Sequence, residues 1–257
     1  MFKQLGFTAV LATLALSPWV MAEESVDQVI ASHLEARGGL DKLNAINSAR
    51  LSGDMSMGGG HGGHGGGMTV PIVAEYQPAQ NRLRFEYVIQ GKTAVRAFDG
   101  KTGWTVQPFL SKTEPERMAE DDLQKIRRQA DFLGALVNHQ EKGHRIELEG
   151  TEDVEGTEAF KLKVTRENGD ISYYFLDTDY YLPFQVISST VIQGRKVKTV
   201  TTLGDYKEVD GVLFAHSVAV SFPGGSQTVT YNKIELNVEL ADDRFTMPTR
   251  TSANTAG

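Results

Sequence analysis

The 257-residue chain contains no cysteine. This absence excludes disulfide bonds, thiol nucleophiles and thiolate metal ligands, so the fold must be stabilised by a packed core. It also excludes the acylated cysteine by which bacterial lipoproteins are tethered, and we therefore expect a freely diffusing protein. A chain of this length can bury about 70% of the surface that its unfolded form exposes.

Long hydrophobic runs are equally scarce. An apolar run from Leu5 to Leu16 follows a single lysine, and a proline and small residues lead from it to Ala22. This pattern predicts a secretory signal peptide over residues 1–22, cleaved after Ala22, and a protein exported to the periplasm. The run is too short for a membrane-spanning helix, which needs about 20 consecutive apolar residues.

Positive charge is in deficit, because 26 Lys and Arg stand against 33 Asp and Glu, giving a formal net charge of −7. An acidic chain of this kind is repelled by polyanions. We therefore expect no nucleic acid among its partners.

Enzyme motifs are missing as well. The sequence has no Gly-x-Ser-x-Gly elbow, no phosphate-binding P-loop and no His-Glu-x-x-His helix. Outside one glycine-rich tract the histidines are scattered, and His216 is interpreted as a buried strand residue with a backbone partner, not as a base. We therefore expect no catalysis and no cofactor.

Two segments show the apolar spacing of helices. Ser25 and Gln28 form a capping box before an apolar stripe that ends at a glycine pair, which predicts a helix of about three turns. A second, longer helix is predicted after Thr113, with Glu116 as its capping partner. Its apolar stripe, at steps of three and four residues, consists of Met118, Leu123, Ile126, Ala130, Leu133 and Val137.

Most of the remaining chain reads as short extended runs between Gly, Asn, Pro and Asp-Gly turn signals. Asn168-Gly169 and Asp210-Gly211 are strong hairpin signals. We count about eleven strands in antiparallel meanders, and one face of such a sheet must be covered. The predicted fold is mainly β (α+β): a large curved antiparallel sheet forming an incomplete barrel, covered by two main helices, as a single domain over residues 23–248 with a disordered tail over 249–257.

The stretch Met57–Met68 reads MGGGHGGHGGGM and separates two predicted strands. Residues 58–67 are glycine and histidine that can bury no apolar surface, which predicts a flexible hairpin insertion. The alternative is a metal site on His61 and His64, because imidazole and the nearby methionine thioethers bind copper. Two histidines make only half of a tetrahedral site, and ordering such a tract costs roughly 1 kcal/mol or more per residue, so the flexible loop is favoured.

A series of short motifs follows in order along the chain. They are Pro78 with NRLRF at 81–85, FDGKTGW at 98–104, Leu182-Pro183, DYKEVDG at 205–211, IELN at 234–237 and FTMP at 245–248. Together they resemble the LolA/LolB superfamily of periplasmic lipoprotein and lipid carriers over most of the mature chain. The resemblance implies an incomplete barrel closed by helices, whose hydrophobic cavity takes acyl chains and passes them on without chemistry. Gln77 stands where the lipoprotein carriers have an arginine before the proline.

The resemblance and the apolar periodicity together assign a candidate binding interior. Its expected lining is Leu83, Phe85, Val95, Trp104, Met118, Ile126, Leu133, Tyr174, Val186 and Val220, and the candidates for a charge that contacts the cargo are Arg82, Arg84 and Arg96. We expect a monomeric carrier or chaperone for a lipid, acyl chain or lipoprotein, with protein partners in the inner or outer membrane. The alternative is a cargo-free envelope scaffold or metal-handling protein, and the distinguishing feature is whether the barrel interior is open or filled.

Overall fold

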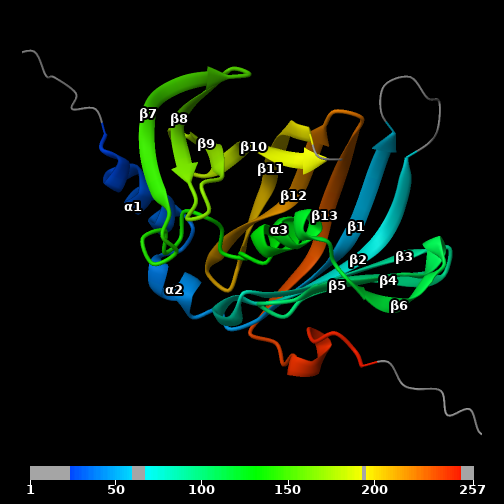
Figure 1. The fold of residues 1–257 in the computed structure, drawn as a ribbon. Helices are drawn as coiled ribbons and strands as arrows, with labels where there is room; N and C mark the ends of the chain where they lie inside the picture. The colour runs from blue at the N-terminus through cyan, green and yellow to red at the C-terminus, as the bar shows by residue number, and fades with distance from the viewer. Residues whose placement is uncertain (1–23, 60–66, 193–194, 250–257) are drawn as a thin grey trace, which may run out of the picture.

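Thirteen antiparallel strands form one continuous sheet in the computed structural model, which describes residues 24–59, 67–192 and 195–249 (Figure 1). The predicted signal peptide, His61 and His64, and residues 250–257 of the predicted tail lie outside the described residues. The strands are β1 (Ala49–Gly59), β2 (Met68–Gln77), β3 (Arg82–Ile89), β4 (Lys92–Phe98), β5 (Gly103–Gln107), β6 (Lys112–Arg117), β7 (Arg145–Val154), β8 (Thr157–Thr165), β9 (Ile171–Asp177), β10 (Pro183–Ile192), β11 (Arg195–Val209), β12 (Val212–Phe222) and β13 (Gly225–Leu236).

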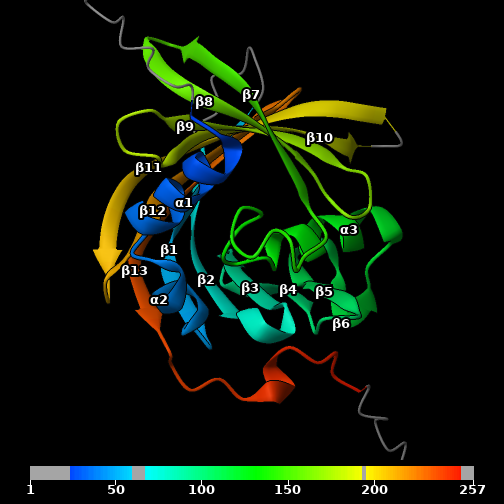
Figure 2. The same ribbon diagram turned by 90° about the vertical axis from the view of Figure 1, so that its left-hand side faces the viewer.

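The sheet consists of two meanders joined in its middle. Its order is β6-β5-β4-β3-β2-β1-β13-β12-β11-β10-β9-β8-β7, so hairpins connect all neighbours except β1 and β13. The edge strands β6 and β7 do not pair, and the sheet curves into a half-barrel that stays open (Figures 1 and 2). The connection from β6 to β7 must therefore cross from one edge to the other, over the concave side. The predicted incomplete barrel is confirmed.

Within the described ranges three α-helices accompany the sheet, α1 (Val26–Ala36), α2 (Leu40–Asn44) and α3 (Glu120–Gln129). The predicted capping box of α1 is present: Gln28 N–H donates to Ser25 Oγ, and Ser25 N–H donates to Gln28 Oε1 at 2.8 Å. α1 and α2 lie together at one end of the half-barrel, whereas α3 lies within its concave side (Figure 2). Within the described residues, none of these helices has the length and apolar character needed to traverse a bilayer.

The second predicted helix is shorter than expected at both ends. The segment around Thr113, expected to cap it, instead forms edge strand β6, which pairs with β5. Pro115 is tolerated there because an edge strand leaves some N–H groups unpaired. At the other end the helix stops at Gln129, and the chain continues irregularly with Gly134 at φ +86°. Leu133 and Val137, assigned to the helix stripe, therefore lie in an irregular segment.

The strand count also exceeds the predicted eleven, chiefly because β6 had been assigned to the helix. β1 continues further into the glycine tract than expected, since Gly58 and Gly59 pair with Ser226 and Gly225 of β13. Glycine weakens a strand, but here the neighbouring strand β13 continues alongside and provides hydrogen-bond partners for the backbone groups.

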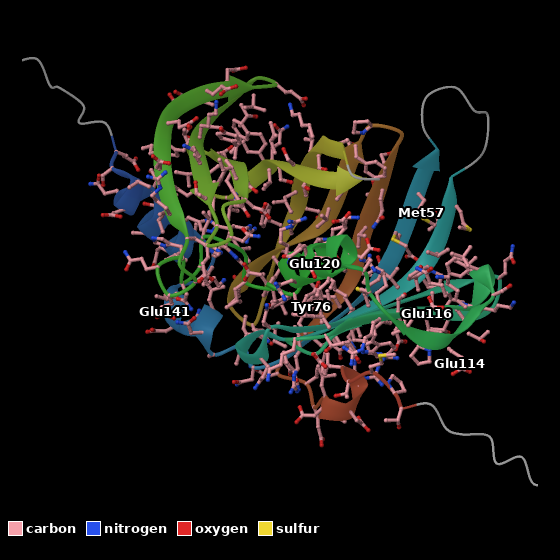
Figure 3. All side chains as sticks on the ribbon, in the orientation of Figure 1. Met57, Tyr76, Glu114, Glu116, Glu120 and Glu141 are labelled. Atoms are coloured by element: carbon pink, nitrogen blue, oxygen red, sulfur yellow. The ribbon has the colours of Figure 1, made fainter. Side chains whose placement is uncertain are left out.

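The crossing segment, residues 130–144, fills one end of the half-barrel. Phe132 packs against the rings of Tyr76 and Phe214, with centroids 4.8 and 5.6 Å apart. Figure 3 shows Tyr76 on the concave side of the sheet. Val137 is fully buried in the same core cluster. The ion pair between Lys142 and Asp131, at 2.6 Å, closes the segment on itself.

A C-terminal strap, residues 237–249, covers part of the convex face. Phe245 of the strap has no exposed surface, and its carbonyl oxygen accepts from Trp104 Nε1 at 2.8 Å. Beside it the buried Glu75 carboxylate pairs with Arg50 at 3.0 Å and with Arg244 of the strap at 2.6 Å. Strands β2 to β5 are therefore packed on both faces.

Candidate functional site

A cavity of about 570 Å³ lies on the concave side of the sheet, between α3 and strands β9 to β13. This volume falls within the range of roughly 300–1,000 Å³ typical of sites for small molecules. Its floor is formed largely by apolar side chains: Phe85, Tyr174, Val186, Val218, Val220, Val229 and Tyr231. We call this hollow the concave cavity.

One flank of the concave cavity carries hydroxyl groups. They are contributed by β9, β10 and β11, and consist of Ser172, Ser188, Ser189, Thr199 and Thr201. The buried Oγ1 of Thr199 has no hydrogen-bond partner among the described residues. The cavity therefore offers an apolar floor and a mildly polar flank.

A second hollow of about 370 Å³ adjoins the concave cavity and shares Tyr76, Tyr174 and Tyr231 with it. Arg37, the C-cap of α1, borders it, donates from Nη1 to the Leu133 carbonyl oxygen at 2.8 Å, and lies over the Phe214 ring. Burial lowers the pKa of Arg37, although Tyr206 and Asp131 partly offset this. α1 and the crossing segment thus close the interior at this end.

The tyrosines of the interior are neutral hydrogen-bonding groups. Burial raises the pKa of Tyr231 to about 12 and raises that of Tyr76 well above its ordinary value. Burial likewise raises the pKa of Tyr206, whose hydroxyl donates to the Pro183 carbonyl oxygen at 2.6 Å. These phenols stay protonated at neutral pH and add no charge to the apolar interior.

Six of the ten sequence-predicted lining residues border these hollows. Those at the concave cavity are Leu83, Phe85, Tyr174, Val186 and Val220, and Leu133 borders the adjoining hollow. Met118 and Ile126 instead pack with Leu83 between α3 and the sheet. Gly103 permits this close approach because it has no Cβ, which would lie 2.9 Å from Met118 Sδ and 3.0 Å from Leu123 Cδ1 of α3. These two side chains hold α3 in place.

The expected inward facing of Val95 and Trp104 is wrong. Both belong to a convex-side cluster with Ala97, against which Val106 and Met247 pack. In β4 the neighbours Ala94 and Phe98 are buried too, so that strand has buried apolar residues on both faces. The order of apolar and polar residues therefore does not show which side chains point to the concave side.

The three candidate arginines also divide between the faces. Arg82 donates to Asp242 at 2.7 Å and to Gln77 at 3.0 Å, and Arg84 pairs with Glu86 and donates to the Arg244 carbonyl oxygen at 2.8 Å. Both therefore hold the C-terminal strap on the convex side. Arg96 alone lines the concave cavity. The expectation that Arg82 and Arg84 contact cargo is corrected accordingly.

Several lining residues were missed by the sequence analysis. α3 contributes Lys125, Arg128 and Gln129 to the concave cavity, and the hairpin between β8 and β9 contributes Arg166 and Asp170. Polar side chains on an amphipathic helix normally face solvent, so their sequence pattern gave no signal for a cavity. They reach the interior because α3 lies within the concave side.

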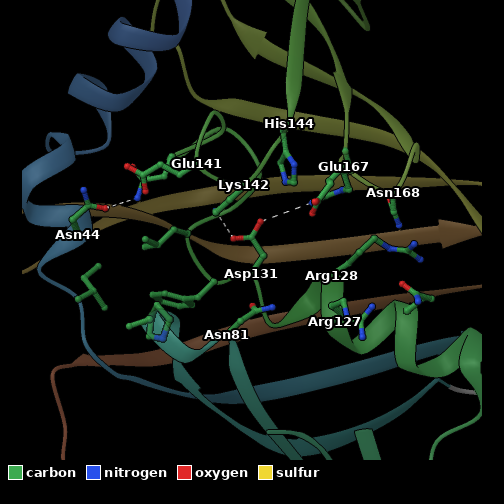
Figure 4. A pocket seen from close by; sticks show the side chains of 18 of the residues that line it. Asn44, Asn81, Arg127, Arg128, Asp131, Glu141, Lys142, His144, Glu167 and Asn168 are labelled. Carbon is green, nitrogen blue, oxygen red and sulfur yellow. Dashed lines mark hydrogen bonds and ion pairs between the residues drawn. The ribbon is translucent and has the colours of Figure 1, made fainter. Parts of the chain in front are cut away.

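A third hollow, of about 760 Å³, is a polar cleft between α2, α3 and the crossing segment (Figure 4). Asp131 is held there by Lys142 at 2.6 Å and by Arg166 at 3.9 Å. Across the cleft Asn138 donates to Asn44 Oδ1 at 2.8 Å. These contacts tie the crossing segment to its neighbours.

The buried histidines have structural partners. His33 Nδ1 donates to the Tyr181 carbonyl oxygen at 2.9 Å, and His216 Nδ1 donates to that of Tyr231 at 2.8 Å. No group of three or more His, Asp or Glu residues within 24–59, 67–192 and 195–249 is placed to hold a metal ion.

Solved structures resemble this one at low sequence identity. A LolA superfamily protein from Nitrosomonas europaea has a TM-score of 0.60 at 13% identity, with 87% of this chain and 98% of that chain covered. A DUF1329 family protein from Desulfovibrio piger has a TM-score of 0.57 at 14% identity, with 87% and 98% covered. A Vibrio parahaemolyticus domain named for outer membrane lipoprotein sorting has a TM-score of 0.56 at 12% identity, with 84% and 94% covered.

No protein-family model matches the chain, and no curated protein sequence matches it. The similarity is therefore one of fold, and that fold is LolA/LolB-like. The resemblance inferred from the ordered motifs is confirmed at this level.

Proposed function

We propose that the protein is a periplasmic carrier or chaperone that holds an apolar ligand, such as a lipid or the acyl chain of a lipoprotein, in the concave cavity. The observation that carries this proposal is an interior closed at one end and hollow at the other. The crossing segment and α1 close the first end, whereas the apolar floor over β10 to β13 borders about 570 Å³ of space.

The affinity for such a ligand can be estimated from the apolar surface that it would bury. Burying about 300 Å² of acyl surface would contribute roughly 7 kcal/mol at ~25 cal/mol per Å². Part of this is lost to the entropy of association, which leaves a dissociation constant in the micromolar to millimolar range. A carrier that must release its ligand needs reversible binding of this kind.

The scaffold alternative requires a filled interior. In that case the apolar side chains of β10 to β13 would pack against a covering element, as Leu83 of β3 and Phe98 of β4 pack against Ile126 of α3. Val186, Val218 and Val220 border space instead. This arrangement favours the carrier, and we expect no catalysis from it.

A cavity-blocking substitution tests the proposal. The probe is the methyl ester of 11-(dansylamino)undecanoic acid, a neutral fluorescent acyl chain. Val218→Trp places an indole in the cavity, and we expect the probe to bind the unchanged protein but at least about tenfold more weakly to this variant. Ala219→Trp, the neighbour on the other face of β12, is the matched control and should bind normally.

Thermal unfolding of both variants is the control that tests whether each is folded. Equal probe affinity in Val218→Trp and the unchanged protein would place the ligand elsewhere and contradict the proposal. No saturable binding to the unchanged protein would favour the scaffold.

A further inference from the structure

The concave cavity carries an excess of positive charge for an interior with an apolar floor. Among the described residues that line it, four are cationic and one is a carboxylate: Arg96, Lys125, Arg128 and Arg166 against Asp170. This contrasts with the chain as a whole, whose net charge is −7. Lys125 and Arg128 lie on α3, Arg96 lies on β4, and Arg166 lies in the hairpin between β8 and β9.

Two of the four cations already have partners. Arg128 donates to Asp170 at 2.8 Å, and Lys125 donates to Asp122 at 3.0 Å. Both bridges involve α3, and they explain these two charges as structural.

Arg96 has no such explanation. It makes no side-chain hydrogen bond or ion pair with any of the described residues, although it is partly buried. Burial lowers its pKa, and the more distant Asp122 carboxylate and Tyr87 phenol offset only part of that effect. A desolvated guanidinium without a paired anion is costly, because water no longer solvates the charge fully.

Arg166 is the second cation of the cavity with unused hydrogen-bonding capacity. Its side chain is 15% exposed, its nearest carboxylate is Asp131 at 3.9 Å, and its buried Nε has no hydrogen-bond partner among the described residues. A guanidinium can donate five hydrogen bonds, and it binds carboxylate or phosphate oxygens best as a two-pronged donor. Capacity for an anion therefore remains at both Arg96 and Arg166.

The arrangement of these groups separates charge from apolar surface. Arg96 lies on β4 and Arg166 lies in the hairpin between β8 and β9, whereas Val186, Val218 and Val220 form the part of the floor on β10 and β12. A ligand that satisfies both needs an anionic group at one end and a hydrocarbon chain at the other.

We infer that the ligand of the concave cavity is an amphiphile with an anionic group, a carboxylate or phosphate, for which Arg96 and Arg166 are the available cationic partners, while its chain lies on the valine floor. This inference rests on the proposed carrier function and narrows its ligand class. It requires the anion to add affinity over the chain alone. A neutral lipid of the same chain length should bind more weakly.

The experiment compares two probes that differ in one charge. They are 11-(dansylamino)undecanoic acid and its methyl ester, titrated at pH 8, where the acid is ionised. For the unchanged protein we expect the acid to bind at least about tenfold more tightly than the ester. This ratio should fall toward one in Arg96→Gln, in Arg166→Gln or in both, while binding of the ester changes little. A full ratio in both variants would overturn the inference.

Arg82→Gln is the matched control, because it removes the same charge from the opposite face of the sheet. It should keep the full ratio between acid and ester. The ester titration also shows that each variant still has its cavity, so that loss of folding is not mistaken for loss of the anion site.

The outcomes separate the two proposals. Equal affinity for acid and ester would overturn the inference but leave the carrier function standing, whereas binding of neither probe would overturn the carrier function itself. Displacement of the acid probe by millimolar inorganic phosphate with no loss of ester binding would indicate a free-anion site, and would overturn the amphiphile. Failure of phosphate to displace the acid supports it.

Discussion

Trp104 and Phe245 are joined by a hydrogen bond from the indole Nε1 to the carbonyl oxygen, 2.8 Å long and spanning 141 residues of chain. Trp104 is 2% exposed and Phe245 has no exposed surface. The convex side of β4 and β5 is therefore a second core, which the C-terminal strap completes.

Removing the Phe245 ring should consequently destabilise the whole sheet. We expect Phe245→Ala to lower the free energy of unfolding by about 3–5 kcal/mol, the usual cost of deleting a buried aromatic side chain. Chemical denaturation measures the loss, and the emission of the newly exposed Trp104 should shift to longer wavelength. Thr246→Ala, at an exposed neighbouring position, should change neither quantity. A similar small effect in both variants would mean that the strap is not packed as described.

Gly38, which follows α1, packs against the turn between β11 and β12. A Cβ there would lie 2.1 Å from the Gly211 carbonyl oxygen, and the backbone has φ +111°. Gly39 has φ +92° but no atom within 4 Å of the same position. Both substitutions by alanine meet backbone strain, of order 1–3 kcal/mol, and only Gly38→Ala adds a steric clash with backbone.

We therefore expect Gly38→Ala to be clearly less stable than Gly39→Ala, by at least about 1 kcal/mol in denaturant titrations. Equal losses would show that the turn moves aside freely. In that case the contact would not fix α1 on the sheet.

His33 should make the protein sensitive to mild acid. Burial, and secondarily the nearby Arg37, lower its pKa to about 4, although the hydrogen bond to Tyr181 opposes this. Because the unfolded histidine titrates near 6.5, the unfolded state takes up a proton first as the pH falls. The free energy of unfolding should thus decline between pH 6.5 and 4, by an amount on the order of 3 kcal/mol from this group.

The test is the pH dependence of stability in His33→Gln. The variant should lose stability at pH 7, because a buried hydrogen bond is removed, but its decline between pH 6.5 and 4 should be shallower than that of the unchanged protein. Parallel curves would contradict the assignment of this acid sensitivity to His33.

Local sequence signals predicted the elements that depend on local chemistry. The capping box at Ser25 and the turn at Asp210-Gly211 form as expected, since each is determined by residues within a few positions. The same kind of local signal gave a wrong prediction at Thr113, where a helix cap was expected. The backbone of this segment instead pairs with the edge of β5 and forms a strand.

The site could be predicted only in part, because the facing of strands depends on distant chain. Val186 and Val220 line the concave cavity as expected. Val95 and Trp104 do not, because the strap from the C-terminus covers them and gives β4 and β5 two apolar faces. The cationic side of the cavity depends on where α3 lies, which its own sequence does not specify.

The central claim is that an apolar chain lies on β10 to β12 inside the half-barrel. Its most direct test is photo-crosslinking with a diazirine-bearing fatty acid, followed by mass spectrometry of the labelled peptides. We predict labels close to Val186, Val218 and Val220, and their loss in Val218→Trp. Labels confined to the polar cleft around Asp131, or spread over the convex face, would contradict the account.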